Sequence, residues 1–289
     1  MRTKFQRTLA TAAVVGGALC ASALADENLG EAGGYRYVSN AVSGGPGFLN
    51  VTVDCPSNRH LLGMGSFVRI VKLQPKDGAD AGSTPDDKAS MRANFGGGTG
   101  TAEALAVCGQ QVSKYRTKAR DIDPQETLTV KAPCPTGTRV TGGGGRIKDA
   151  TTLSSNADLN SSFPYDGNDG DSDHDDGWAV RGWNDRPSGR GRLTAYAICA
   201  DLEPVYMTAD SSAPPGTGTT TTASCPDTHF LSSAGFERSD TPGIGTFVEL
   251  KQTDSIVDGD VVPDDDARAS HYNPSASPAS VTTYAVCLP

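Results

Sequence analysis

Apolar and polar residues alternate in three stretches of the chain, and each stretch ends in a cysteine. The stretches read NVTVDC, ETLTVKAPC and TTTTASC, and ten residues beyond each cysteine stands a glycine, at Gly65, Gly144 and Gly235. A period of two in Thr- and Val-rich segments is typical of half-buried β-strands, and a glycine inside a strand indicates a bulge or a close approach of two backbones. Helical periodicity is sustained nowhere, so the pattern predicts an all-β chain.

Two further strand patterns recur in the same order. One reads SMRANF, WAVRGWN and RASHYN and follows a pair of adjacent aspartates, and the other reads ALAVC, AYAIC and TYAVC and closes on a second cysteine. The aspartate pairs stand at 86–87, 175–176 and 264–265, so both steps between them are 89 residues long. Equal spacing along a whole chain is the mark of internal repetition. The sequence therefore predicts three copies of one β-rich unit.

The boundaries of the copies follow from a tyrosine that precedes each Cys-Pro dipeptide by 18 or 19 residues. The three tyrosines are Tyr37, Tyr115 and Tyr206. We therefore divide the mature chain into repeat 1 at 35–114, repeat 2 at 115–205 and repeat 3 at 206–289.

Each copy is short and has few large apolar side chains, so the burial available to a single copy is marginal. We therefore expect the three repeats to pack around a pseudo-threefold axis and to share a core. A β-prism-like arrangement of three sheets is the first choice of fold. A β-trefoil is the second choice, and three small sandwiches are the third.

The first residues of the chain have the pattern of a secretory signal peptide. A basic start is followed by a short apolar run and the small-residue ending Ala23-Leu24-Ala25. We assign residues 1–25 to the signal peptide and residues 26–34 to a flexible N-terminus of the mature chain. The protein is expected to be secreted and extracellular.

The charge of the mature chain limits the classes of partner. Loss of the signal peptide removes three basic residues and no acidic ones, which leaves 22 Lys and Arg residues against 34 Asp and Glu residues. Nucleic acid is disfavoured as a partner because a surface that binds its backbone needs concentrated Lys and Arg. No membrane span is expected, since no other stretch approaches about 18 apolar residues. The expected partner is a carbohydrate or an extracellular protein.

Six cysteines remain in the mature chain, two in each repeat. Six cysteines allow fifteen pairings, but pairing within repeats treats every copy alike. Zinc binding is the competing interpretation; it is disfavoured because the Cys-x-x-Cys grouping is absent and an exported chain meets an oxidising compartment. The predicted disulfides are Cys55–Cys108, Cys134–Cys199 and Cys225–Cys287.

Repeat 2 carries the clearest motifs, which are Cys134-Pro135, the glycine run 142–145, Asp-Asp-Gly-Trp at 175–178 and Tyr-Ala-Ile-Cys at 196–199. With these motifs the mature chain resembles secreted actinobacterial proteins that contain three repeats of Cys-Pro, a Gly-rich strand, an acidic Asp-Gly…Asp-Asp-Gly-Trp loop and a closing Tyr-Ala-Ile/Val-Cys. The resemblance implies an extracellular location, and no established activity accompanies it. Repeats 1 and 3 depart from the pattern, since Ala89 and Ala267 stand where repeat 2 has Trp178.

The acidic loop of repeat 2 offers candidate ligands for calcium. Oxygens at every second residue of a Gly-containing turn are how calcium loops surround a hard cation. The alternating residues of the loop are Asp169, Asp171, Asp173 and Asp175. The spacing differs from that of the twelve-residue calcium loop, so a solvated charged turn is the competing interpretation. Calcium is the single candidate cofactor.

The strand after this loop offers a candidate ligand surface. Arg181 and Trp183 would share one strand face because side chains alternate with a period of two. Together with Trp178 they would place an aromatic platform beside carboxylates, which suits a sugar or a cell-wall surface. Packing under a loop is the competing interpretation for both tryptophans.

Catalytic signatures are missing from the sequence. It contains no Gly-x-Ser-x-Gly, no His-Glu-x-x-His and no phosphate-binding Gly-Lys-Ser/Thr loop. We therefore expect a protein that is not an enzyme, with a secreted hydrolase as a remote alternative. Two function classes remain: a non-catalytic binding protein for carbohydrate or cell wall, and a structural or adaptor subunit of an extracellular assembly.

Overall fold

Every regular element in the described part of the chain is a β-strand, which confirms the predicted all-β class. The computed structural model describes residues 22–23, 26–66, 70–77, 87–95, 97–149, 157–167, 172–184, 186–239, 247–253, 262 and 264–289. Within these ranges no helix is long and apolar enough to cross a membrane.

Each predicted repeat holds six strands of the described chain. Repeat 1 contains β3 (Tyr35–Gly44), β4 (Phe48–Asp54), β5 (His60–Ser66), β6 (Ile70–Lys76), β7 (Lys88–Asn94) and β8 (Gly100–Gly109). Repeat 2 contains β9 (Lys114–Ile122), β10 (Thr127–Pro133), β11 (Arg139–Asp149), β12 (Ala157–Tyr165), β13 (Gly177–Asn184) and β14 (Gly191–Ala200). Repeat 3 contains β15 (Val205–Ala213), β16 (Thr217–Ser224), β17 (Phe230–Arg238), β18 (Phe247–Thr253), β19 (Asp266–Asn273) and β20 (Ala279–Leu288).

The six strands pair in the same order in every repeat. The first, sixth and third strands form one antiparallel sheet, and the second, fifth and fourth form another, as in β9-β14-β11 and β10-β13-β12 of repeat 2. The two sheets face each other across a buried apolar cluster. In repeat 2 that cluster contains Val130 and Trp178 from one sheet and Val140 and Leu193 from the other. Each repeat is therefore a small two-sheet unit.

All three predicted disulfides are present, and each joins the two sheets of one repeat. The first cysteine directly follows the second strand, and the second cysteine lies within the sixth strand. The bonds are Cys55–Cys108, Cys134–Cys199 and Cys225–Cys287. Because they close loops of 53, 65 and 62 residues, each contributes on the order of 4 kcal/mol in the chain-entropy model.

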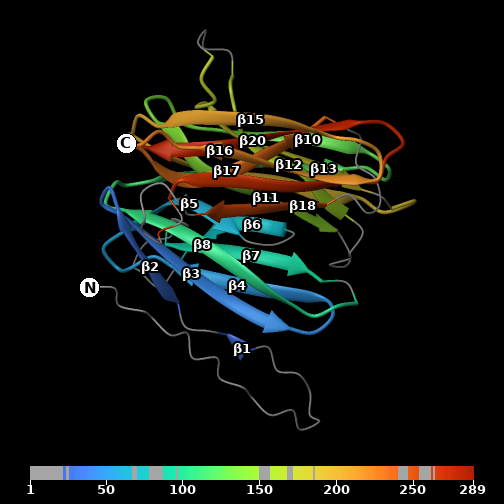
Figure 1. Cartoon of the computed structure of the whole chain (residues 1–289), viewed down its shortest axis with the longest axis horizontal. Helices are drawn as coiled ribbons and strands as arrows, with labels where there is room; N and C mark the ends of the chain where they lie inside the picture. Colours follow the sequence, from blue (N-terminus) through green and yellow to red (C-terminus); the bar gives the residue numbers. More distant parts are fainter. Residues whose placement is uncertain are drawn as a thin grey trace.

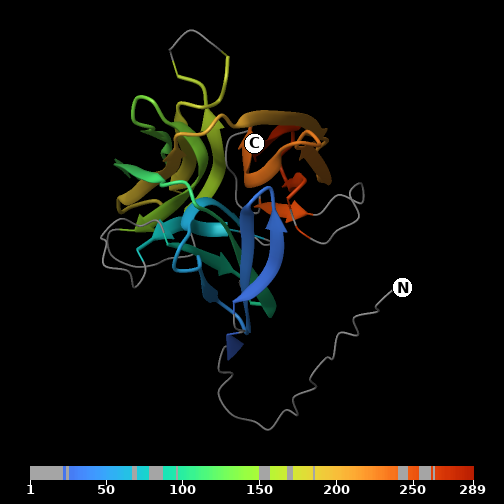
Figure 2. The same ribbon diagram turned by 90° about the vertical axis from the view of Figure 1, so that its left-hand side faces the viewer.

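Two of the sheets continue from one repeat into the next. Strand β6 pairs with β11 at Lys72 and Arg146, and β12 pairs with β17 at Ser162 and Phe236. Figure 2 shows the result, in which blue, green and orange lobes are grouped about a common centre. The expected β-prism of three sheets is not confirmed, because each repeat forms two sheets and these extend into its neighbours. The described strands also form no closed barrel of the trefoil kind.

The third strands of the repeats, β5, β11 and β17, pack against one another at the centre of the molecule (Figure 1). Each strand shifts its register at the same place, next to Leu62, Thr141 and Ser232. The Ser232 hydroxyl donates a hydrogen bond to the Thr141 carbonyl over 2.8 Å, and the Ser233 hydroxyl donates one to the Met64 carbonyl over 2.9 Å. Repeat 3 is thereby bonded to both other repeats.

The tyrosines near the start of the repeats make two more of these connections. The Tyr37 hydroxyl of repeat 1 donates to the Leu231 carbonyl of repeat 3 over 2.8 Å. The Tyr206 hydroxyl of repeat 3 donates to the Val140 carbonyl of repeat 2 over 2.7 Å. The equivalent Tyr115 stacks instead on a tyrosine of β14, with 6.0 Å between the ring centroids. In repeats 1 and 3, the first strand of the repeat is therefore hydrogen-bonded to the third strand of a neighbouring repeat.

Residues 26–34, for which the sequence predicts a flexible segment, contain a strand. Residues 27–32 form β2 (Glu27–Ala32), which pairs with β3, and a short β1 (Ser22–Ala23) pairs with the other end of β3. Leu29 packs against a buried cluster that includes Leu62 of repeat 1 and Leu288 of repeat 3. Apolar contacts with both terminal repeats, together with the ladder to β3, order this segment.

We predict that Gly63→Ala destabilises the protein by about 1–3 kcal/mol, which is the usual cost of overpacking a filled core. A Cβ atom at Gly63 would lie 2.1 Å from the Ser232 carbonyl oxygen, and a backbone atom cannot rotate away. Gly97→Ala is the matched control, because a Cβ atom there meets no heavy atom within 4 Å. Urea titration of both variants measures the effect, and equal midpoints for the two would contradict close packing at the centre.

Candidate functional site

The recurring aspartate pairs have a structural role through their main chain. In each repeat the amide of the first cysteine donates a hydrogen bond to the carbonyl of the second aspartate of the pair. These bonds are Cys55 to Asp87 at 2.7 Å, Cys134 to Asp176 at 2.8 Å and Cys225 to Asp265 at 2.9 Å. The first aspartate accepts from the third strand, as in Val140 to Asp175 at 2.9 Å and Leu231 to Asp264 at 2.5 Å. The pair therefore fixes the Cys-Pro turn and the start of the central strand.

A cleft of about 470 Å³ lies beside this turn in repeat 2. It is bounded by the turn, by the aspartate pair and by the segment that follows the second cysteine. Its lining residues are Cys134, Pro135, Thr136, Gly137, Thr138, Arg139, Asp175, Asp176, Asp201, Leu202 and Glu203. Hydrogen-bonding groups dominate this lining, and Pro135 and Leu202 add apolar surface.

Arg139 is the central charged group of the cleft. Its Nε lies 2.6 Å from the Asp175 carboxylate, and Nη1 forms an ion pair with Glu203. Asp175 is buried, whereas the Glu203 side chain is 81% exposed, so a ligand can displace Glu203 more easily than Asp175. Burial and the nearby Asp175 charge raise the pKa of Tyr206. Tyr206 therefore keeps its proton and its hydrogen bond to Val140 behind the cleft.

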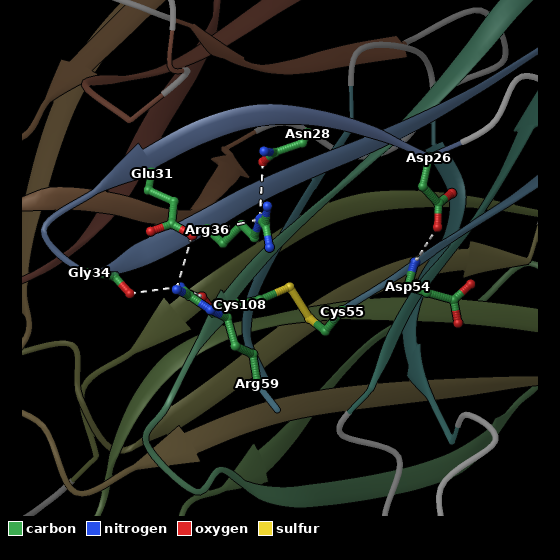
Figure 3. The surroundings of a disulfide bond; sticks show 9 residues. All are labelled: Asp26, Asn28, Glu31, Gly34, Arg36, Asp54, Cys55, Arg59 and Cys108. Carbon is green, nitrogen blue, oxygen red and sulfur yellow. Dashed lines mark hydrogen bonds and ion pairs between the residues drawn. A yellow bond between two sulfur atoms is a disulfide. The ribbon is translucent and has the colours of Figure 1, made fainter. Parts of the chain in front are cut away.

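The hairpin of β2 and β3 contacts the corresponding turns of repeats 1 and 3 through Arg59 and Phe230. Figure 3 shows Arg59 of repeat 1, beside the Cys55–Cys108 disulfide, donating to the Gly34 carbonyl over 2.8 Å and pairing with Glu31 over 3.1 Å. In repeat 3, Phe230 packs against the hairpin turn and lies 6.2 Å from the Tyr35 ring, between centroids.

The structure places Trp178 in the core of repeat 2, where it is 1% exposed. Its indole nitrogen donates to the Ser162 hydroxyl over 2.9 Å, and its ring lies against Gly143. A ligand at the surface does not reach this ring. This burial favours the competing interpretation of Trp178 as a packing residue over its predicted role in ligand binding.

Arg181 and Trp183 share a strand face as predicted, but the described part of the acidic loop, residues 172–176, lies at the other end of β13. Arg181 Nε donates to the Asn160 side-chain oxygen over 2.7 Å, and its guanidinium also bonds the Arg238 carbonyl of repeat 3. Trp183 is half-buried near the far end of β13, six residues beyond Gly177. An extended strand of that length spans about 20 Å. The predicted aromatic platform beside carboxylates is therefore not formed by these residues.

The structure describes two of the four aspartates that are predicted to bind calcium. Asp169 and Asp171 lie outside the described residues. Asp173 is exposed, and the carboxylate of Asp175 is bonded to Arg139. Within the described ranges no three or more His, Cys, Asp or Glu side chains are grouped so that they could hold a metal ion. Calcium binding stays a prediction for this loop.

Sequence reasoning missed an aromatic cluster between repeats 2 and 3. Phe163 stacks on Tyr284 with 5.6 Å between centroids, and His174 lies 5.3 Å from the same ring. The Tyr284 hydroxyl lies 3.1 Å from a Glu237 carboxylate oxygen. Burial, reinforced by Glu237, raises the pKa of Tyr284, so this hydroxyl donates to Glu237. The sequence signal for this cluster is the tyrosine that AYAIC and TYAVC share. The ring neighbours of Tyr284 lie in repeat 2, so no pattern within repeat 3 identifies them.

Comparison of the chain with protein-family models and with curated proteins finds no match.

We predict different outcomes for the two tryptophans. Trp178→Ala should cost about 3–5 kcal/mol of unfolding free energy, because it empties a core site. Trp183→Ala should cost less than about 1 kcal/mol, because this side chain is only half-buried at a strand end. Denaturant titration followed by circular dichroism compares the two variants. A larger loss for Trp183→Ala would show that the core of repeat 2 has been assigned incorrectly.

Proposed function

We propose that the protein is a secreted, non-catalytic binding protein whose ligand site is the cleft beside Arg139. The observation that carries this proposal is the cleft of about 470 Å³ beside the Cys-Pro turn of repeat 2. In repeats 1 and 3 the β2–β3 hairpin contacts the equivalent turns through Arg59 and Phe230. Concave sites of this size with convergent polar groups are where small ligands bind. The cleft of repeat 2 is a site of this kind among the described residues.

Carbohydrate, free or on a cell-wall surface, is the ligand class that suits this lining. Sugar hydroxyls both donate and accept hydrogen bonds, and the cleft offers the Asp176, Asp201 and Glu203 carboxylates as acceptors and Arg139 as a donor. Leu202 adds an apolar surface for the C–H groups of a sugar ring. The Cys134–Cys199 disulfide fixes the walls of the cleft, which lowers the entropy lost on binding.

The side chains of the cleft favour binding over catalysis. None of the four histidines of the chain lines it, and no serine or cysteine thiol is available there as a nucleophile. The buried Asp175 carboxylate is held in an ion pair with Arg139, so it is not free to act as a general acid or base. A secreted hydrolase stays the remote alternative.

A structural or adaptor subunit is the second candidate function. It is favoured by the divergence of the first residue of the third strand, which is His60 in repeat 1, Arg139 in repeat 2 and Phe230 in repeat 3. Three different side chains at one place in the fold give the repeats unlike surfaces. Such surfaces could contact different protein partners while the sheets supply a rigid support.

We predict that the mature protein binds glycans or isolated cell walls and that Thr136→Trp abolishes this binding by filling the cleft. Thr136 is exposed on the turn, so the substitution should leave the fold intact. Glu203→Gln should change affinity by less, and Arg190→Gln, an exposed site elsewhere in repeat 2, should not change it. Glycan arrays and cell-wall sedimentation, each with and without chelator, measure the binding.

Two outcomes would contradict the proposed ligand site or the proposed function. Glycan binding that survives Thr136→Trp would remove the cleft from the proposal. Absence of glycan binding, together with co-purification of one defined protein from culture supernatant, would favour the adaptor function instead.

A further inference from the structure

Three cationic side chains stand side by side where repeats 1 and 2 join. In the paired strands β7, β6 and β11, Arg92 lies opposite Lys72, and Lys72 lies opposite Arg146. We call these three residues the cation row. The neighbouring residues Leu73 and Ile147 point into the cores of repeats 1 and 2, so the cation row lies on the outer face of this sheet.

The cation row is electrostatically costly as it stands. Like charges directly opposite each other on neighbouring strands destabilise a sheet. All three side chains are only partly exposed, and the Arg92 Nε is buried without a hydrogen-bond partner. No carboxylate among the described residues lies within ion-pair distance of any member of the row. This is notable in a chain with 34 Asp and Glu residues, which could readily supply one.

Carboxylates do occur on the same face, but they are paired with other cations. Asp54 forms an ion pair with Lys88 toward one side of the sheet, and Asp121 lies 3.1 Å from Arg192 toward the other. The ion pairs of the described residues on this face therefore lie at its margins, and the cation row at its centre takes part in none of them.

Neutral hydrogen-bonding groups lie beside the row. Gln74 is two residues from Lys72 on the same face of β6, and its side-chain oxygen lies 3.3 Å from the Tyr196 hydroxyl. Thr194 is opposite Arg146 on β14. The Gln74 amide nitrogen and the Thr194 hydroxyl, next to two guanidinium groups and an ammonium group, are donors of the kind that tetrahedral oxyanions require.

We propose that the cation row is a binding site for a phosphate or sulfate group. Lys72 provides a central ammonium charge, and Arg92 and Arg146 flank it with planar donor groups. The negative charge of the oxyanion compensates the repulsion within the row, and the Gln74 amide nitrogen and the Thr194 hydroxyl complete its hydrogen bonds. The site is separate from the cleft of repeat 2 and does not depend on the function proposed for that cleft.

The experiment is isothermal titration of sodium phosphate and, separately, sodium sulfate into the full mature protein, with ionic strength held constant by chloride. We expect saturable binding at one site. Lys72→Gln should weaken it at least about tenfold, the loss expected for a hydrogen bond to a charged group. The matched control is Lys148→Gln, which removes the same charge from an exposed position two residues beyond Arg146 on β11 and should change affinity by less than about twofold.

The proposal fails if the wild-type protein shows no saturable binding, or if Lys72→Gln and Lys148→Gln weaken binding equally. Loss of folding does not confuse the result, because removal of the Lys72 charge relieves repulsion in the row. In chloride buffer, Lys72→Gln should therefore unfold at a temperature no lower than that of the wild type.

A second arm distinguishes the source of the oxyanion. Dextran sulfate is used to displace inorganic sulfate, and uncharged dextran serves as the control. Displacement by dextran sulfate at a lower concentration of sulfate groups assigns the site to an oxyanion carried by a polymer. Binding of inorganic sulfate without displacement by the polymer assigns it to a free anion, and binding of neither overturns the proposal.

The pH dependence gives a further prediction. Burial, with Lys76, Arg146 and Arg92 as like-charged neighbours, lowers the pKa of Lys72 from 10.5 to about 8. The unfolded chain therefore binds the proton more tightly, so the folded state is penalised fully below pH 8 and recovers stability as pH rises from about 8 toward 10.5. Bound sulfate should relieve the penalty while Lys72 is charged.

Thermal unfolding at several values between about pH 7 and pH 9 tests this behaviour. The increase in melting temperature given by sulfate should shrink over this interval in the wild type, and Lys72→Gln should lose that pH dependence. An unchanged pH dependence in the variant would show that Lys72 does not contact the anion.

Discussion

The close approach of three backbone segments at the centre of the molecule is the constraint on which the rest of the structure depends. There is no room for a Cβ atom at Gly63, because the Ser232 carbonyl occupies that space. Gly142 in turn lies against the Gly63 backbone. Serine hydroxyls satisfy two carbonyls at this place. Once these strands are in contact, the remaining strands of each repeat are directed outward, and the turns that follow the first cysteines lie at the periphery, where binding sites can diverge.

Much of this architecture could be predicted from the sequence, because its determinants are local or repeated. Alternating side chains indicate strands directly, and repetition selects one disulfide scheme among many. The glycines at equal distances beyond the first cysteines predict a bulge or a close approach of backbones, and two of them, Gly144 and Gly235, show the close approach. A Cβ atom at Gly144 would lie 2.4 Å from the Leu73 carbonyl oxygen, and one at Gly235 would lie 3.0 Å from that of Ser162. Both contacts are made to the neighbouring repeat.

The arrangement of the sheets could not be predicted. The alternation of apolar and polar residues shows which face of a strand is buried, but it does not show which strand is paired with it. The exchange of partners between repeats, at Lys72 with Arg146 and at Ser162 with Phe236, depends on contacts between residues more than seventy positions apart. The same limit applies to the ligand surface predicted at Arg181 and Trp183. Arg181 and Trp183 do share a face, but repeat 3 covers Arg181 with the Arg238 carbonyl, and no pattern within repeat 2 indicates this.

The aspartate pairs illustrate a different limit. Recurring carboxylates suggest ligands for a cation, yet the feature common to the repeats is the use of their carbonyl groups, which every residue possesses. Side-chain identity adds only local contacts, such as that of Asp175 with Arg139 in repeat 2. A motif can thus recur because of its conformation while its side chains take different roles in each copy.

The contact between the two ends of the described chain has a consequence for how the molecule is made. The Tyr35 hydroxyl donates to the carbonyl of Pro289 over 3.0 Å, and these residues are 254 positions apart in sequence. Contacts of such separation form slowly, because a long loop must close before they contribute. Repeats 1 and 2 can form their own sheets during synthesis. The contact between repeats 1 and 3 can form only after the last strand has been synthesised. Until then the apolar surface beneath β2 is exposed, and the incomplete chain depends on being kept from aggregation.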